Sequence, residues 1–164
     1  MCGFFGFHSF SVDRNEKITV SKKAIKLLNS RGPDSNGIEL EDNNNLILSH
    51  NRLAILDLSE TGNQPMCSNS GNLSIVFNGE IYNHLNLRKK LNNENKFNHW
   101  KGSSDTETLI QAIDIWGIEK TLEELNGMFS FALWNRKLKT LFLARDRFGE
   151  KPLYYGWIPQ KECF

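Results

Sequence analysis

The chain has 164 residues, with 20 Lys and Arg against 19 Asp and Glu, so its formal net charge at pH 7 is +1. This length fits one domain with a sizeable core. The balanced charge offers no basic surface for nucleic acid or for an anionic membrane. No apolar run is long enough to span a bilayer, and the start Phe4-Phe5-Gly6-Phe7 lacks the basic leader of a signal peptide. We therefore expect neither nucleic acid nor a membrane as a partner.

The three cysteines Cys2, Cys67 and Cys163 are odd in number and widely spaced. No Cys-x-x-Cys pair and no Cys/His cluster indicates a metal site. We therefore expect free thiols in a reducing, cytoplasmic compartment and no bound metal.

The first predicted elements are a short aromatic strand over residues 2–8 and a helix over 21–29. In the helix, apolar residues recur at helical spacing among lysines. The breaker Ser30-Arg31-Gly32-Pro33-Asp34 ends it. β-type runs follow at 46–50 and 73–77.

The dipeptide Asn78-Gly79 is expected to stop the second of these runs. Leu87 and Leu91, one turn apart, predict a helix over 84–91. The best supported helix covers 105–116, where Ser104 and Glu107 form a capping box. Its apolar stripe consists of Leu109, Ile110, Ile113 and Trp116.

A short helix is predicted over 118–125, after which the apolar period changes to two. Phe129, Phe131 and Leu133 point one way along a strand, and Ser130 and Ala132 the other. Further strands are predicted over 139–144 and 152–157. Clustered strands with clustered helices favour a layered α+β domain over alternating βαβ units.

The second residue is the most informative candidate for chemistry. Removal of Met1, which precedes a small residue, would leave Cys2 with both a thiol and a free α-amine, able to act as nucleophile and built-in base. An α-amine ordinarily titrates at about 8 and a cysteine thiol at about 8.5, so proton exchange between two such groups is almost balanced. The competing interpretation is an ordinary buried cysteine.

Amide hydrolysis also needs oxyanion donors and groups that hold the substrate. The side-chain amide of Asn78 and the backbone N–H of Gly79 can point at one oxygen, although a plain Asn-Gly hairpin turn is the competing interpretation. Arg52 can clamp a carboxylate, or can be a surface ion-pair partner. Asp105, in the first turn of a helix, can accept from an ammonium, stabilise the helix end, or do both.

Two histidines are tempting as conventional bases. Nothing in the sequence places His50 near Cys2, so we interpret it as a partly buried strand residue. The same interpretation applies to His8.

Together these residues make the chain resemble the class II glutamine amidotransferases, which carry an N-terminal cysteine nucleophile. Within them it looks most like the glutaminase domain of glutamine-hydrolysing asparagine synthetases. The matching stretches are Met1-Cys2-Gly3 through Gly6, Arg31-Gly32-Pro33-Asp34 with Gly37, His50-Asn51-Arg52-Leu53-Ala54-Ile55, Asn63-Gln64-Pro65-Met66, Asn78-Gly79-Glu80-Ile81-Tyr82-Asn83-His84, Ser104-Asp105-Thr106-Glu107, Asn126-Gly127-Met128-Phe129-Ser130-Phe131-Ala132, Ala144-Arg145-Asp146-Arg147-Phe148-Gly149 and Lys151-Pro152-Leu153-Tyr154-Tyr155.

The resemblance implies a four-layer αββα sandwich of two antiparallel sheets, the N-terminal-nucleophile hydrolase fold. It implies that Cys2 attacks the side-chain amide of glutamine, with Asn78 and Gly79 as the oxyanion hole. Arg52 would hold the substrate carboxylate, and Glu80 and Asp105 its ammonium. The backbone of Leu53, Ala54, Ile55 and Leu56 would line the pocket. Arg31 and Asp34 are expected to shape a nearby loop.

The resemblance also implies a partner domain. Residues 1–164 would form a type-2 glutamine amidotransferase domain, truncated at its C-terminal end, with the ATP-dependent synthetase domain absent from this chain. ATP and Mg would be needed only there, and no cofactor here. Ammonia would go to aspartate, with a sugar or another carboxylate as the alternative acceptor. A non-catalytic glutamine-binding module is expected if Met1 is retained, and the resemblance is compatible with a homodimer.

Overall fold

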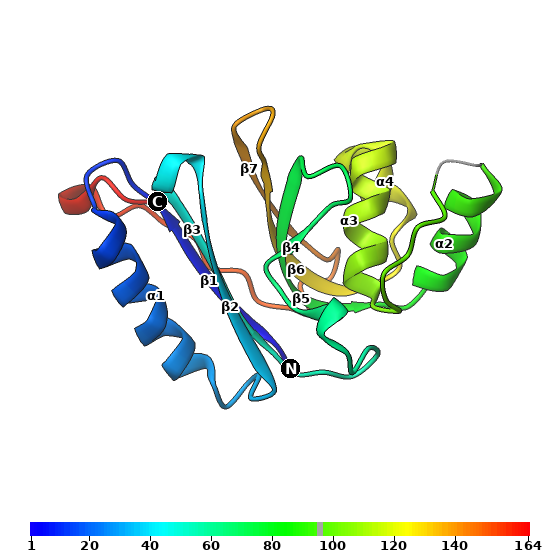
Figure 1. The fold of residues 1–164 in the computed structure, drawn as a ribbon, viewed down its shortest axis with the longest axis horizontal. Coiled ribbons are helices and arrows are strands. Elements are labelled where there is room, and N and C mark those ends of the chain that lie inside the picture. The colour runs from blue at the N-terminus through cyan, green and yellow to red at the C-terminus, as the bar shows by residue number, and fades with distance from the viewer. Residues whose placement is uncertain (95–96) are drawn as a thin grey trace.

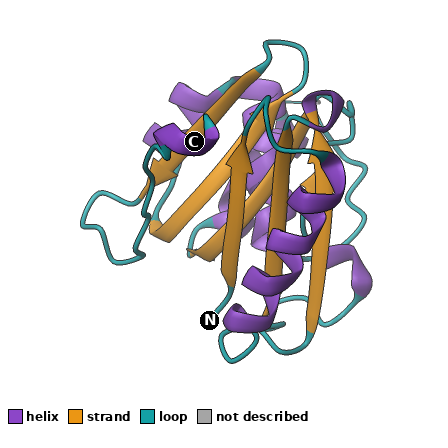
Figure 2. Ribbon diagram, turned by 90° about the vertical axis from the view of Figure 1, so that its left-hand side faces the viewer, coloured by secondary structure: helices purple, strands orange, loops and turns teal. Residues whose placement is uncertain are grey.

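The computed structural model describes residues 1–94 and 97–164. These residues form four layers, in which one helix, two antiparallel sheets and a group of helices follow one another (Figures 1 and 2). The strands are β1 (Gly3–His8), β2 (Ser35–Glu41), β3 (Leu46–Arg52), β4 (Met66–Cys67), β5 (Leu73–Ile81), β6 (Gly127–Asn135) and β7 (Thr140–Arg145). The helices are α1 (Arg14–Leu28), α2 (His84–Asn93), α3 (Asp105–Trp116) and α4 (Ile118–Glu124). The predicted α+β, four-layer αββα sandwich is confirmed.

The two sheets have the strand orders β1-β3-β2 and β4-β5-β6-β7, with antiparallel neighbours throughout. In the first sheet Gly3 lies opposite Asn51, so the start of the chain lies beside the end of β3. In the second sheet β4 pairs with β5 only through Met66 and Cys67. The remainder of that edge of β5 has no neighbouring strand among the described residues.

Apolar clusters fill the spaces between the layers. Because side chains alternate along a strand, Ile47 packs toward α1, whereas Leu46 and Leu48 pack against the second sheet. The period of two predicted over residues 129–133 is confirmed. The cluster beneath α2 to α4 contains Phe129, Phe131 and Leu133, and the cluster between the sheets contains Ala132.

Two elements of the first half differ from expectation. The helix predicted over 21–29 begins at Arg14, because Asp13 caps it by accepting from the N–H groups of Asn15 and Glu16 at 2.7 and 3.0 Å. Strand β2 was not predicted, and it is held by pairing along its length with β3.

The start of α3 is close to its prediction. Ser104 Oγ accepts from the N–H of Glu107 at 3.1 Å, which is one half of the expected capping box. The Glu107 carboxylate accepts instead from the N–H groups of Lys101 and Gly102, at 2.7 and 3.0 Å. It therefore fixes the loop before the helix rather than the cap residue itself.

Strand β5 does not stop at Asn78-Gly79, so that prediction and the hairpin interpretation are both wrong. The strand continues to Ile81, with Gly79 opposite Phe129 of β6. A Cβ atom on Gly79 would lie 2.2 Å from the carbonyl oxygen of Met128. The glycine is therefore needed for close approach of two strands rather than for a turn.

The strand predicted over 152–157 is also wrong, because these residues have no regular structure. Tyr154 and Tyr155 are 91% and 75% exposed, and a strand needs a neighbour to pair with. Within the described residues, none of the helices has the length and apolar character needed to cross a membrane.

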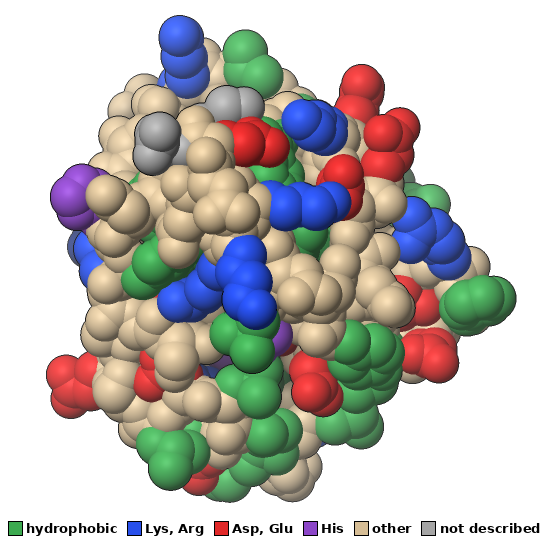
Figure 3. Space-filling view, turned by 90° about the vertical axis from the view of Figure 1, so that its right-hand side faces the viewer, with side chains coloured by type: hydrophobic (Ala, Val, Ile, Leu, Met, Phe, Trp, Pro, Cys, Tyr) green, Lys and Arg blue, Asp and Glu red, His purple; other side chains and the backbone are tan. Residues whose placement is uncertain are grey.

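The outer face of α2 to α4 carries basic and acidic side chains interspersed (Figure 3). Hydrophobic side chains gather along its lower edge in that view. The loop between β3 and β4 lies at this edge in Figure 1, and it exposes Ile55 and Leu58.

Candidate active site

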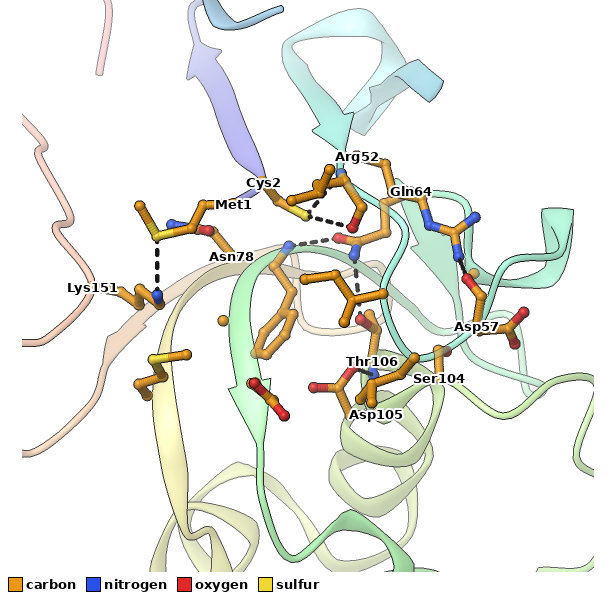
Figure 4. A pocket seen from close by; sticks show the side chains of 18 residues that line it. Met1, Cys2, Arg52, Asp57, Gln64, Asn78, Ser104, Asp105, Thr106 and Lys151 are labelled. Carbon is orange, nitrogen blue, oxygen red and sulfur yellow. Dashed lines mark hydrogen bonds between the residues drawn. The ribbon is translucent and has the colours of Figure 1, made fainter. Parts of the chain in front are cut away.

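A cavity of about 90 Å³ lies where the start of β1, the end of β3 and the free edge of β5 meet the first turn of α3 (Figure 4). Most of the predicted site residues line it, namely Cys2, Arg52, Leu53, Ile55, Leu56, Asn78, Gly79, Glu80 and Asp105. The lining also contains residues that the sequence did not assign to a site, namely Met1, Asp57, Gly62, Gln64, Phe77, Ser104, Thr106, Met128 and Lys151. Ala54 is the predicted residue that the lining does not include.

The thiol of Cys2 is half-buried and held by the backbone of Leu53. The N–H of Leu53 donates to Cys2 Sγ at 3.4 Å, and the thiol lies 3.7 Å from the Leu53 carbonyl oxygen. The carbonyl of Cys2 accepts from Arg31 Nε at 3.1 Å. Cys2 is therefore not an ordinary buried cysteine. That description fits Cys163, whose side chain packs under α1.

The backbone N–H of Gly79 faces the cavity. Along a strand, N–H groups point alternately to the two sides. The N–H of Phe77 leaves β5 on the side away from β6 and donates to Gln64 Oε1 at 2.6 Å, and the N–H of Ile81 does the same to Asp105 Oδ2 at 2.8 Å. Gly79 lies between them on the same side, and its N–H has no acceptor among the described residues.

The side chain of Asn78 is 5% exposed and lines the cavity beside the start of the chain. Figure 4 shows it close to Met1 and Cys2. The Asn78 amide and the N–H of Gly79 are two neutral donors in the lining of the cavity that also holds the Cys2 thiol. Neutral donors of this kind can stabilise a developing oxyanion.

Arg52 lies at the cavity edge, with its guanidinium turned toward the loop 57–63 (Figure 4). Its Nη1 donates to the carbonyl of Ser59 at 2.7 Å and to Asn63 Oδ1 at 3.1 Å, and its Nη2 donates to the carbonyl of Asp57. These bonds leave the Nε–H and one Nη2 hydrogen without an acceptor among the described residues. These two donors form one side of the guanidinium fork, which matches a carboxylate.

Two carboxyl groups, Glu80 and Asp105, line the same cavity. Burial raises the pKa of Asp105 to about 6, although hydrogen bonds from the backbone of Ile81 and Thr106 oppose part of this rise. The nearby charge of Glu80 raises it further. A cationic group that enters the cavity would therefore be stabilised by two carboxylates and would favour the ionised form of Asp105.

Asp34 shapes the strand end, as expected. Its N–H donates to the carbonyl of Arg52 at 3.0 Å, and its Oδ2 accepts from the N–H of Ala54 at 2.8 Å. The backbone N–H of Ala54 is therefore engaged by a residue that does not line the cavity.

Gln64 and Thr106 are the buried polar residues that sequence reasoning missed. Gln64 Nε2 donates to Thr106 Oγ1 at 3.2 Å, while its Oε1 holds the N–H of Phe77. The side chain of Gln64 thus ties the free edge of β5 to α3. The only sequence signal was its place in the motif Asn63-Gln64-Pro65-Met66.

Neither histidine serves the cavity. His50 is fully buried, its Nε2 donates to the carbonyl of Phe77 at 2.9 Å, and burial lowers its pKa to about 4. His8 lies at the far end of β1 and contacts Asp42 at 3.2 Å. Within residues 1–94 and 97–164, no three His, Cys, Asp or Glu side chains come together so that they could hold a metal ion.

Comparison with known proteins finds a matching family and several similar proteins. The family described as "Glutamine amidotransferase domain" matches residues 1–164. A protein of Methanocaldococcus jannaschii named putative asparagine synthetase [glutamine-hydrolyzing] 2 is 38% identical over 96% of this chain and 32% of its own length. A Gibberella zeae protein named amidase chry2 is 37% identical over 94% of this chain and 24% of its own length. The chain thus spans about a quarter to a third of these relatives.

The fold has a counterpart among solved structures. The glutamine phosphoribosylpyrophosphate amidotransferase of B. subtilis superposes with a TM-score of 0.71 and 20% sequence identity. The superposition covers 89% of this chain and 37% of that one.

Proposed function

The chain belongs to the glutamine amidotransferase domain family, and we propose that it hydrolyses L-glutamine to glutamate and ammonia with Cys2 as the nucleophile. The observation that carries the proposal is that the Gly79 N–H and the Cys2 thiol face one small cavity.

The first half of the proposed reaction forms a thioester. With Met1 removed, the α-amine of Cys2 takes the thiol proton, and Sγ attacks the side-chain amide carbon of glutamine. The oxyanion that forms accepts hydrogen bonds from the Asn78 amide and the Gly79 N–H. The amine then gives its proton to the leaving nitrogen, the C–N bond breaks, and ammonia departs.

The second half releases glutamate. Water attacks the thioester carbon, the amine takes a proton from that water, and the C–S bond breaks. The proton returns to the sulfur, which restores the thiol and the neutral amine. No cofactor enters either half, so ATP and Mg would act only in a separate synthetase domain.

The ends of glutamine are held by opposite charges. The free side of the Arg52 fork binds the α-carboxylate, and Glu80 and Asp105 bind the α-ammonium. The backbone of Leu53, Ile55 and Leu56 forms the wall on the β3 side. A substrate that lacks either charged end loses one of these contacts, which favours free glutamine over glutamine within a peptide.

The test is the release of glutamate and ammonia by Cys2→Ala, with Cys67→Ala as the matched control. We expect no turnover in the first variant and full turnover in the second. Mass spectrometry of the same samples establishes whether Met1 is absent. Wild-type turnover rates in Cys2→Ala would overturn the proposal, and glutamine binding without turnover in a chain that retains Met1 would favour a binding module.

We further propose that the ammonia serves an ATP-dependent synthetase domain that amidates aspartate. The name of the M. jannaschii relative supports this acceptor. The alternative acceptor is a sugar or another carboxylate. The test is formation of asparagine from glutamine, aspartate and ATP by the protein that contains both domains. Consumption of glutamine without asparagine would favour another acceptor.

A further inference from the structure

A lysine side chain is buried beside the start of the chain. Lys151 is 6% exposed and lines the same cavity as Cys2. Its Nζ has one hydrogen-bonding partner among the described residues, the thioether sulfur of Met1 at 3.2 Å (Figure 4). A thioether is a weak acceptor, and buried lysines are almost always paired. The ammonium of Lys151 therefore lacks a strong partner.

The backbone of Lys151 is held on both sides. Its N–H donates to Asp146 Oδ2 at 3.0 Å, and its carbonyl accepts from Arg145 Nε at 2.8 Å. Asp146 also accepts from the N–H groups of Phe129, Phe148 and Glu150. The turn that carries Lys151 is therefore fixed to β6 and β7, and the side chain stays directed at the N-terminus.

Removal of Met1 takes away the thioether and creates a new α-amine at Cys2. We propose that Lys151 is a positioning residue that keeps this amine neutral, and so able to act as the base, by placing a second positive charge beside it. The inference deepens the proposed function and rests on it.

Charged groups face the start of the chain from several elements. Arg31 donates to the carbonyl of Cys2 and adds to the positive side. Arg52, Asp57, Glu80 and Asp105 line the cavity from β3, its following loop, β5 and α3. In the complex the two carboxylates Glu80 and Asp105 pair with the substrate ammonium, and the Arg52 guanidinium with the substrate carboxylate. The Asp57 carboxylate is held by hydrogen bonds from Ser59, Thr61 and the Ser103 N–H. Lys151 and Arg31 are then the positive charges that still act on the amine.

The direction of the effect follows from repulsion between like charges. Loss of the Lys151 charge makes the amine easier to protonate, so its titration midpoint moves to higher pH. The loss of one like charge from the wall of the same cavity is expected to shift this midpoint by about one pH unit. At pH values below the midpoint, a rise of about one pH unit lowers the neutral fraction of the amine by up to about tenfold.

The test is a pH titration of the Cys2 α-amine in protein from which Met1 has been removed. The titration is monitored through the NMR signals of the Cys2 carbon atoms in cysteine-labelled protein. Lys151→Met is expected to raise the midpoint by about one pH unit, and Lys151→Arg to leave it nearly unchanged. Lys137→Met removes an equal charge from the exposed turn between β6 and β7, and is expected to have no effect.

Glutamine hydrolysis provides the second measurement. In Lys151→Met the acidic limb of the pH profile of kcat/KM is expected to shift to higher pH by the same interval as the NMR midpoint. In Lys151→Arg the limb is expected to stay at its wild-type pH. An unchanged or lowered midpoint in folded Lys151→Met overturns the inference. Because the NMR titration needs no turnover, absence of glutaminase activity in the wild-type protein would overturn the proposed function separately.

Discussion

Asp105 accepts a hydrogen bond from the backbone N–H of Ile81 at 2.8 Å, and this bond joins the first turn of α3 to the end of β5. The same carboxyl accepts from the N–H of Thr106 at 2.9 Å. Both bonds lower the pKa of the carboxyl, but its burial outweighs them and raises the pKa to about 6. A group that anchors the fold thus also changes charge just below neutral pH.

The affinity for glutamine is expected to weaken below pH 6. An ordinary aspartate stays ionised down to about pH 4, but Asp105 becomes protonated near 6 and then no longer pairs with the substrate ammonium. The KM for glutamine is expected to rise up to about tenfold per unit of pH below this point, in steady-state assays. Asp105→Asn should remove this dependence, and Asp114→Asn on the same helix should retain it. A KM that is constant from pH 7 to pH 5 would contradict the assignment.

Asn78 is expected to affect kcat rather than substrate binding. Asn78→Ala removes one of two oxyanion donors, which corresponds to a loss of about 3 kcal/mol, or roughly a hundredfold in kcat. The KM should change little, since the ground-state amide needs this donor less than the oxyanion does. Asn72→Ala, on an exposed turn before β5, serves as the control. Equal kcat values for the two variants would remove Asn78 from the proposed role.

Gly79→Ala is expected to destabilise the whole domain. The added Cβ would lie 2.2 Å from the carbonyl oxygen of Met128, in a strand pair that cannot separate without losing its hydrogen bonds. We expect a loss of more than about 2 kcal/mol in the free energy of unfolding, measured with urea. At Gly156 a Cβ meets no atom within 4 Å, so Gly156→Ala should be nearly neutral. Equal stability of the two variants would show that β5 and β6 leave room for a side chain at position 79, contrary to this structure.

Acid is expected to weaken the turn that carries Lys151. Burial alone would raise the pKa of Asp146, but backbone hydrogen bonds from Lys151, Glu150, Phe129 and Phe148 lower it below its ordinary value. A lowered pKa means that the carboxylate contributes stability above about pH 4, and that this contribution disappears as the pH falls through the folded-state pKa.

The corresponding variant is Asp146→Asn, which replaces one of two accepting oxygens by a donor. We expect a loss of about 1 to 3 kcal/mol at pH 7, measured with urea. The difference from wild type should narrow as the pH falls from 5 toward 2. A difference that is independent of pH would show that the ionised carboxylate is not what holds the turn.

Much of the fold could be predicted from local patterns in the sequence. The Ser104 cap and the alternation over residues 129–133 both depend on neighbours within a few positions, and both were predicted. Asn78-Gly79 was misread because the local preference of this dipeptide for a turn is overridden by pairing with β6. Strand β2 was missed because pairing with β3 holds it in place, whereas its own sequence has no clear strand pattern.

The site divides in the same way. Cys2, Arg52, Asn78, Gly79 and Asp105 were predicted because their residue types suit one reaction and occur in a recognisable order. Gln64 was not, since its amide acts only through its contacts with Phe77 and Thr106 in the folded chain. Lys151 was not predicted either. It lies far along the chain from Met1 and Cys2, and only folding buries it beside them.

The short strand β4 has a consequence for association between molecules. A strand edge with open N–H groups is a template for pairing with another chain, and such pairing leads to aggregation. Here the side chains of Gln64 and Asp105 occupy the N–H groups of Phe77 and Ile81, on either side of Gly79. A foreign strand therefore finds no row of adjacent donors. Along this edge of β5, within the described residues, the Gly79 N–H is the donor that remains open, and it faces the cavity. The two side chains that border the proposed oxyanion donor thus also protect this strand edge against pairing with another chain.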